Sequence, residues 1–273
     1  MEAKEDSGDV REVACFRCHD GHQRTYEHWS STLHCRMRFS FFSPRAISKQ
    51  RLPVIYFLSG LSRTEQTCPE QGGTQQYLCK HNLCMVWPDT SPRGLELDKT
   101  VESAWYGPGA SFYVDATEKP WEDHYRMFTY ITQELPALIE ERFNVTKEKG
   151  VCGHSMGGHG ALMCMLKQPK LFNSVSVFAP LCSTIKSPVS QRAMLRYFGE
   201  DKGAWAPWDV LTLALQLPKD TSPIPILIDQ ACVTYRRQEE FGHGYYFLQT
   251  FIADHISFHA KHLNPPPPPP SSS

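Results

Sequence analysis

Long hydrophobic runs are missing from this chain of 273 residues, and its longest apolar stretches, such as residues 54–58, are far too short to span a bilayer. Blocks of like charge are missing too, since 28 Lys and Arg residues balance 29 Asp and Glu residues to a formal net charge of -1. Such a balance argues against a surface for nucleic acid or anionic membrane. The acidic first residues have no basic flank and no apolar core, so we expect no signal peptide. We therefore expect a cytoplasmic protein whose partner is a small molecule.

Cysteine is too infrequent, with ten residues in the chain, for the dense disulfide framework of a small secreted protein. Several cysteines lie inside apolar patterns, as buried thiols of a reducing compartment do: Cys84, Cys152 and Cys164. Cys15 and Cys18, followed by His19 and His22, have a spacing that zinc sites use. No second CxxC pair and no spaced histidine pair follows at a suitable distance, so we expect no metal site.

Four short apolar runs rich in branched and aromatic residues predict buried parallel strands: residues 53–58, 83–87, 174–178 and 224–228. Helical patterns lie between them, and the clearest covers residues 121–143, where Pro136 predicts a kink or a boundary. Because strands that alternate with helices form βαβ units, we expect an α/β fold with a mostly parallel central sheet and helices on both faces. Functional residues gather at the carboxyl ends of the strands in such sheets.

The two ends of the chain show other patterns. Residues 32–42 alternate between apolar and polar side chains, which predicts antiparallel strands at an edge of the sheet. Residues 245–263 predict the last helix, and the tail PPPPPPSSS is expected to stay extended and solvated. We therefore expect a single domain over residues 1–264, with residues 1–25 its least defined part, and a Pro/Ser tail over residues 265–273.

The sequence Gly153-His154-Ser155-Met156-Gly157 matches the GxSxG motif of a nucleophile elbow. In that turn between a strand and a helix, the serine takes a strained conformation that exposes its Oγ, and the glycines let neighbouring backbone approach closely. An apolar run precedes the motif and a helical pattern follows it. This context favours Ser155 as a nucleophile over the alternative, a glycine-rich turn without a catalytic role.

A serine nucleophile needs two amides that stabilise an oxyanion, and a histidine base. The amide of Met156 is the first candidate donor. The second is the amide of Leu61, in the small-residue loop after the strand predicted at 53–58, although that segment also fits an ordinary loop. His243 lies in a glycine-flanked loop before the last helix, late in the chain as the base of such enzymes is.

Other histidines have plainer interpretations. His154 and His159 flank the serine, and we expect them to be structural or to line a substrate pocket. His255, His259 and His262 share one helical face; this spacing can hold a metal, but packing or solvent exposure is the more common use.

Several longer segments resemble the S-formylglutathione hydrolase (esterase D) family: YFLSGLSRTEQ (56–66), PDTSPRG (88–94), SFYVDAT (111–117), YRM (125–127), GHSMGGHGAL (153–162), ILIDQ (226–230) and ADHISFHAKHL (253–263). The resemblance implies the α/β-hydrolase fold and hydrolysis of S-formylglutathione to glutathione and formate in formaldehyde detoxification, with general carboxylesterase activity. It also implies a cytoplasmic homodimer that needs no cofactor and binds neither nucleic acid nor membrane. On this resemblance Ser155 is the nucleophile and His243 the general base. The amides of Leu61 and Met156 form the oxyanion hole.

The chain departs from the family after ILIDQ. There the family has a loop with the triad acid, a helix and a strand before the histidine, whereas here only residues 231–242 separate Gln230 from His243. A crossover alone takes at least about 10–12 residues, and a strand about 5–6 more. Either an internal segment is missing or this variant is built differently. The triad acid stays unassigned, with Asp229, Glu239 and Glu240 as possible substitutes, and a catalytically impaired or inactive scaffold is the alternative function.

Smaller departures concern the substrate mouth. Arg63 stands where the family usually has Cys, and Ser111 where it usually has Gly, so we expect both to alter that mouth. Trp105, Tyr106 and Tyr113 are candidate pocket walls, with a place in the core as the alternative. A related acyltransferase, which would use the same serine, is a third reading of the function.

Overall fold

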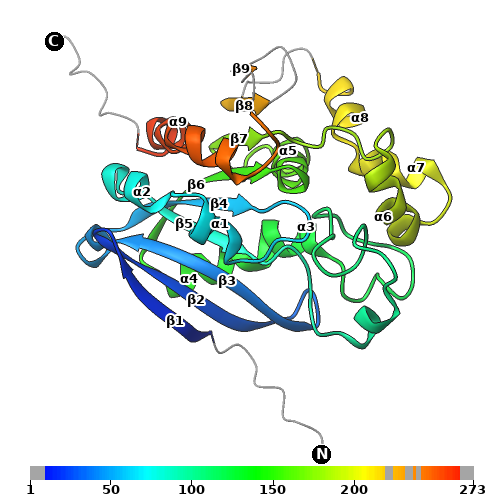
Figure 1. The fold of residues 1–273 in the computed structure, drawn as a ribbon, viewed down its shortest axis with the longest axis horizontal. Coiled ribbons are helices and arrows are strands. Elements are labelled where there is room, and N and C mark those ends of the chain that lie inside the picture. The colour runs from blue at the N-terminus through cyan, green and yellow to red at the C-terminus, as the bar shows by residue number, and fades with distance from the viewer. Residues whose placement is uncertain (1–9, 219–223, 231–235, 238–240, 265–273) are drawn as a thin grey trace, which may run out of the picture.

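A central sheet organises the protein, whose computed structural model describes residues 10–218, 224–230, 236–237 and 241–264. Within these residues, nine strands lie in the order β1-β2-β3-β5-β4-β6-β7-β8-β9 (Figure 1). Their bounds are β1 Arg11–Cys18, β2 Gly21–Ser30, β3 Cys35–Pro44, β4 Leu52–Leu58, β5 Cys84–Pro88, β6 Val145–His154, β7 Ser174–Phe178, β8 Ile226–Gln230 and β9 Arg236–Arg237. The predicted tail at 265–273 lies outside the described residues.

Strand direction divides the sheet into two parts. β1, β2 and β3 pair antiparallel, as do β3 and β5, whereas all the pairs from β5 to β9 are parallel. The four predicted parallel strands are confirmed as β4, β5, β7 and β8, with small shifts at their ends. The antiparallel pattern at 32–42 is confirmed by β3, part of the antiparallel edge (Figure 1). The fold is therefore the predicted α/β arrangement.

Both faces of β4 are buried, which explains why this strand is apolar throughout. In β4, Val54, Tyr56 and Leu58 belong to one hydrophobic cluster, whereas Ile55 and Phe57 belong to the other. Successive side chains of a strand point to opposite faces, so a strand between two layers of helices needs apolar residues at every position.

Helices cover the two faces, as the sequence predicts. Their bounds are α1 Thr67–Gln71, α2 Gln75–His81, α3 Met127–Thr129, α4 Leu135–Arg142, α5 Met156–Lys167, α6 Pro188–Phe198, α7 Lys202–Trp205, α8 Val210–Leu215 and α9 Tyr245–Leu263. Buried side chains of α1, α2 and α9 form one cluster with the sheet, and those of α3 to α8 belong to the cluster on the other face. The last helix has the predicted bounds.

The helix predicted at 121–143 is shorter and irregular. It begins at Met127, continues as a π-helical turn over Tyr130–Glu134, and becomes α4 at Leu135. Pro136 lies in the first turn of α4 and has no N–H for the carbonyl four residues earlier. The predicted boundary at this proline is therefore confirmed, as a change of helix type.

The CxxC pair near the start of the chain lies in a hairpin. Cys15 and Cys18 are both in β1, three residues apart, so their side chains point to opposite faces of the strand. Within the described part of the chain, no group of three or more His, Cys, Asp or Glu side chains is placed to hold a metal ion.

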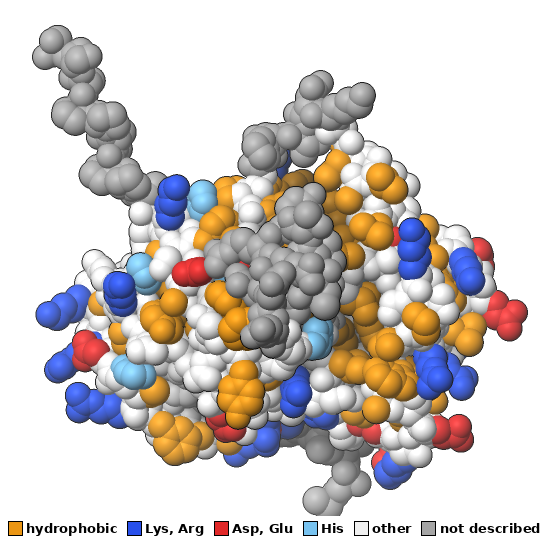
Figure 2. Space-filling view, turned by 45° about the horizontal axis from the view of Figure 1, so that its top comes forward, with side chains coloured by type: hydrophobic (Ala, Val, Ile, Leu, Met, Phe, Trp, Pro, Cys, Tyr) orange, Lys and Arg blue, Asp and Glu red, His pale blue; other side chains and the backbone are white. Residues whose placement is uncertain are grey.

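Hydrophobic side chains gather on one part of the surface, over α6 to α8 at the right of the view in Figure 2. The exposed leucines of this region are Leu195, Leu211, Leu215 and Leu217. None of the described helices is both long and apolar enough to cross a membrane.

Candidate active site

Ser155 occupies a strained turn between the end of β6 and the start of α5. Its backbone angles are φ 57° and ψ -116°, a region that residues with a Cβ rarely adopt. A Cβ at Gly153 would lie 2.1 Å from the carbonyl oxygen of Gly157, and one at Gly157 would lie 1.9 Å from that of Leu58. Only glycine fits at either position, and the GxSxG motif therefore has the geometry of an elbow that holds the serine above the sheet.

The imidazole of His243 lies over this serine. Its Nε2 is 2.8 Å from Ser155 Oγ, although the two residues are far apart in the sequence. The surrounding groups partly desolvate the ring, which lowers the pKa of His243 below its ordinary value. The structure thus brings together the predicted nucleophile and the predicted base, with the base in its neutral form near pH 7.

His154 holds the loop that carries the base. Its Nε2 lies 3.0 Å from the backbone carbonyl oxygen of His243. A carbonyl only accepts, so Nε2 carries the proton and Nδ1 is left unprotonated. Burial, and then the nearby His243, lowers the pKa of His154 to about 4. The sequence predicted a structural or pocket-lining histidine here, and His154 is both, because it also lines the cavity beside Ser155.

His159, on the other side of the serine, is fully buried and structural. Its two ring nitrogens lie near the carbonyl oxygens of Phe112 and Trp208, at 3.1 and 3.0 Å. Those contacts tie two loops at the site to α5.

The two residues that carry the predicted oxyanion donors line the same cavity. Met156 is the first residue of α5, so its N–H has no acceptor within the helix. Among the described residues the amide of Leu61 donates no hydrogen bond to backbone or side chain. Leu61 and Met156 both line the cavity that contains Ser155 and His243. Two unused donors beside a serine nucleophile are the arrangement that stabilises a tetrahedral oxyanion.

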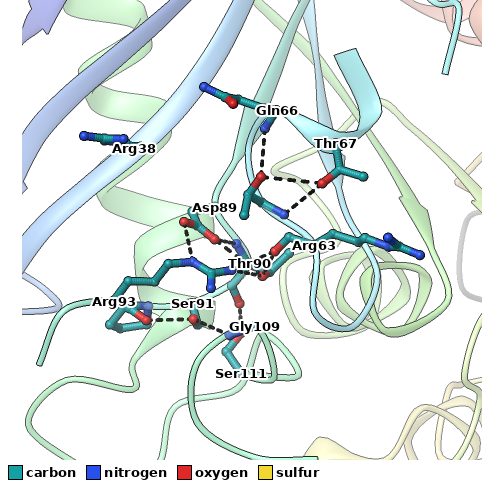
Figure 3. A network of polar contacts seen from close by, with 12 residues as sticks. Arg38, Arg63, Gln66, Thr67, Asp89, Thr90, Ser91, Arg93, Gly109 and Ser111 are labelled. Atoms are coloured by element: carbon teal, nitrogen blue, oxygen red, sulfur yellow. Dashed lines mark hydrogen bonds and ion pairs between the residues drawn. The ribbon is translucent and has the colours of Figure 1, made fainter. Parts of the chain in front are cut away.

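A polar network fixes the loop behind Leu61 (Figure 3). Arg93 donates from Nε to the carboxylate of Asp89 at 2.8 Å, and from Nη2 to the carbonyl oxygen of Arg63 at 2.9 Å. Thr90 donates from Oγ1 to the same carbonyl. The segment PDTSPRG therefore holds the loop that carries an oxyanion donor, a role that its sequence alone does not indicate.

The same network reaches the segment around Ser111. The amide of Ser62 donates to the carbonyl of Gly109 at 2.8 Å, and the Ser111 hydroxyl donates to the carbonyl of Thr90. Ser111 is buried and does not itself line the cavity, but the next residue, Phe112, does, so an effect of Ser111 on the substrate mouth stays a prediction. Its hydroxyl bond to Thr90 stabilises the loop that carries Leu61 from the side away from the cavity.

The cavity above the serine has a volume of about 460 Å³ and mostly apolar walls. Its described lining comprises Gly60, Leu61, Arg63, Trp105, Phe112, His154, Ser155, Met156, Ala179, Pro180, Leu181, Ser187, Val189 and His243. Trp105 is a pocket wall as predicted, whereas Tyr106 and Tyr113 are buried in the core and do not line the cavity. Arg63 lines the cavity mouth, as expected.

Asp229, one of the three possible substitutes for the triad acid, contacts a different histidine. Its Oδ2 lies 3.3 Å from Nε2 of His255, and both side chains are fully buried. In the sheet Asp229 pairs with Phe178, whose ring stacks on His255, so Asp229 faces α9. His255 is about 15 Å along α9 from the start of the helix next to His243. Asp229 as a partner of His243 is therefore wrong, because its strand position turns it toward the middle of α9.

The other two candidate acids, Glu239 and Glu240, lie outside the described residues. No carboxylate in the described part of the chain contacts His243. Of the helical histidines, His259 packs against the sheet, with its ring nitrogens 2.7 and 2.8 Å from the hydroxyls of Ser174 and Ser176. The packed interpretation of His255 and His259 is thus confirmed.

Comparisons with known proteins agree with this geometry. A family described as "Putative esterase" matches residues 30–240. The S-formylglutathione hydrolase of Mus musculus is 41% identical over 281 residues, which cover 93% of this chain and 99% of the relative. That of Bos taurus is 41% identical over 282 residues with the same coverage. A solved S-formylglutathione hydrolase from Agrobacterium tumefaciens has a TM-score of 0.84 at 33% identity, covering 92% of this chain and 99% of that one. This chain therefore belongs to the S-formylglutathione hydrolase family of esterases.

Proposed function

We propose that this protein hydrolyses S-formylglutathione to glutathione and formate, and simple carboxylic esters as well. The observation that carries the proposal is the 2.8 Å contact between His243 Nε2 and Ser155 Oγ, in a cavity with two unused amides. The relatives' names supply the substrate. No cofactor enters the reaction.

The reaction takes two steps at Ser155. In the first, neutral His243 accepts the hydroxyl proton while Oγ bonds to the formyl carbon, and the Leu61 and Met156 amides stabilise the oxyanion. The carbon–sulfur bond then breaks, and the proton on His243 passes to the departing sulfur. In the second, His243 takes a proton from water, the hydroxide attacks the formyl ester, and Oγ leaves with that proton as formate is released.

The described residues supply no triad acid for this mechanism. Such an acid holds the imidazole in one tautomer and stabilises imidazolium; its replacement in a serine protease lowers kcat by about 10⁴, with residual catalysis by the oxyanion hole. In this chain the bond from His154 to the His243 carbonyl holds the loop but does not set the ring tautomer. We propose a slow but active enzyme. The comparisons lend no support to the alternative of an inactive scaffold.

We infer that the family's acid segment is absent between Gln230 and His243. The alignment with the mouse relative spans 281 positions, whereas 93% of 273 residues is about 254, so about 27 positions face gaps in this chain. β8 and β9 pair in parallel although only residues 231–235 separate them. Parallel neighbours ordinarily need a crossover of about a dozen residues or more. A transcript that encodes a longer segment at this point would restore the acid.

The proposal is tested with the purified full chain and its Ser155→Ala variant. We expect the unmodified chain to hydrolyse S-formylglutathione and to be labelled by a fluorophosphonate, and the variant to do neither. Ser48→Ala, which removes an exposed hydroxyl just before β4, at the end of that strand opposite Leu61, is the control and keeps both properties. Folded protein without hydrolysis and without labelling at Ser155 contradicts the proposal.

The cellular setting is proposed on the family resemblance and the balanced charge. We propose a cytoplasmic homodimer that acts in formaldehyde detoxification and does not bind nucleic acid or membranes. Sedimentation equilibrium measures the oligomeric state, and a purely monomeric protein at micromolar concentration contradicts the dimer.

A further inference from the structure

The active-site cavity contains one residue with a permanent charge among its described lining, and that residue is Arg63. The other lining side chains are apolar, hydroxyl-bearing or histidine. Both histidines, His154 and His243, have pKa values lowered by burial, so they are neutral near pH 7. A substrate in this cavity therefore meets one fixed positive charge.

The positive charge of the Arg63 guanidinium is not neutralised by a described carboxylate. Within the described residues it makes no ion pair, whereas Arg38 pairs with Glu27 at 3.1 Å and Arg93 with Asp89 at 2.8 Å. The network behind the loop uses only the backbone carbonyl of Arg63, and the side chain extends away from that network (Figure 3). An exposed, available guanidinium at the mouth of a catalytic cavity is a ready partner for a carboxylate.

The position of the Arg63 side chain is held by an aromatic ring. Its guanidinium carbon lies 5.6 Å from the ring centroid of Tyr245, the first residue of α9. Such a contact between a cation and a ring restrains the side chain without neutralising its charge. Arg63 therefore sits between the oxyanion loop and the helix that follows His243.

Arg63 also borders a second hollow. This hollow has a volume of about 480 Å³ and is lined by Arg63, Glu70, Gln71, Gly244, Tyr245, Tyr246 and Gln249. Since Arg63 lines both hollows, a substrate with its acyl carbon at Ser155 and a long leaving group extending into the second hollow passes this guanidinium.

We propose that Arg63 binds a carboxylate of the thiol leaving group, so that the enzyme selects anionic thiol esters over neutral ones. This inference rests on the proposed function, because the glutathione part of that substrate carries two carboxylates, on its γ-glutamyl and glycyl ends. The guanidinium can form two parallel hydrogen bonds to one carboxylate, which a lysine or an amide cannot.

Binding without turnover tests the proposal. Isothermal titration calorimetry of the full chain is carried out with S-methylglutathione, which keeps both carboxylates, and with its diethyl ester, which has none. The glycyl monoethyl ester shows which carboxylate is bound. The variants are Arg63→Gln, which removes the charge, Arg63→Lys, which keeps it, and Arg51→Gln, which removes an exposed arginine at the opposite end of β4.

We expect Arg63→Gln to raise the Kd of S-methylglutathione about tenfold, the size of a charge-assisted contact that is partly exposed. Arg63→Lys raises it less, and Arg51→Gln changes it less than twofold. The diethyl ester binds the unmodified chain and Arg63→Gln equally.

Three results would overturn the proposal. The unmodified chain does not bind S-methylglutathione, Arg63→Gln weakens the binding of S-methylglutathione and of its diethyl ester by the same factor, or Arg51→Gln raises the Kd of S-methylglutathione as much as Arg63→Gln does. Hydrolysis of S-formylglutathione is measured separately: charge-dependent binding without hydrolysis overturns the proposed function and leaves the binding role of Arg63 intact.

Discussion

The Nε2 atom of His243 lies 2.8 Å from Ser155 Oγ, while no carboxylate of the described residues contacts that imidazole. A base in this setting differs from one in a complete triad, where a neighbouring carboxylate favours the protonated ring and raises its pKa. Here desolvation acts alone and lowers the pKa of His243.

The first prediction concerns the pH dependence of catalysis. Only neutral His243 accepts the serine proton, so kcat/KM is high above the pKa of His243 and falls as the pH drops through it. Because that pKa is lowered, the acid limb of kcat/KM for a neutral ester lies below pH 6.5, the ordinary value for histidine. A titration midpoint above 6.5 would show that an acid outside the described residues supports the ring.

The second prediction concerns His154 as a positioning residue. His154→Leu removes the hydrogen bond to the His243 carbonyl and lowers kcat about tenfold, the worth of one hydrogen bond, with little change in KM. His154→Gln, whose amide can replace Nε2 as donor, keeps more of the activity. Steady-state kinetics of both variants with one ester provide the measurement. Equal kcat values for Leu and Gln would exclude the hydrogen bond as the cause.

The third prediction concerns strain at the nucleophile. At φ 57° and ψ -116° a Cβ is unfavourable, so Ser155→Gly relieves strain that Ser155→Ala retains. Both variants are inactive. We expect the glycine variant to be more stable than the alanine variant by about 1 kcal/mol, because the strain that glycine relieves exceeds the cost of its greater entropy in the unfolded chain. Urea unfolding of the two variants measures the difference, and an alanine variant of equal or higher stability contradicts it.

The fourth prediction concerns the packing of the elbow. A Cβ at Gly157 would lie 1.9 Å from the backbone oxygen of Leu58, so Gly157→Ala forces β4 and α5 apart and costs at least about 3 kcal/mol of stability. Gly242→Ala is the matched control, because no atom lies within 4 Å of a Cβ built there. Thermal unfolding of both variants checks the contrast. Similar melting temperatures for the two would refute the close approach.

The elbow was predictable because its chemistry is local. Ser155 and its glycines are contiguous, and the strain that defines the turn depends on a few neighbouring residues. The parallel strands were predictable for a similar reason, since burial on both faces leaves a continuous apolar run such as that of β4. The irregular helix around Pro136 was only partly predictable, because apolar periodicity does not distinguish a π-helical turn from an α-helical one.

The acid and the loop supports were not predictable in this way. Asp229 follows the strand predicted at 224–228, as a catalytic acid would, but in the structure it lies within β8. The alternation of side chains in that strand and its pairing with β7 turn Asp229 toward His255. The contact of His154 with the His243 carbonyl spans much of the chain. No local pattern records such a contact, since it depends on how α9 packs against β6.

Short contiguous patterns in the sequence are enough to predict the family, the fold class, the strained serine at the elbow and a histidine base near the end of the chain. Which of these groups meet depends on the folded arrangement of distant segments. The tertiary structure placed His243 against Ser155, turned Asp229 away, braced the Leu61 loop through Asp89 and Arg93, and left the Arg63 guanidinium at the cavity mouth. These contacts depend on the register of strands and on the packing of helices that are far apart in the chain. The direction of a strand side chain is fixed by its position in the sheet.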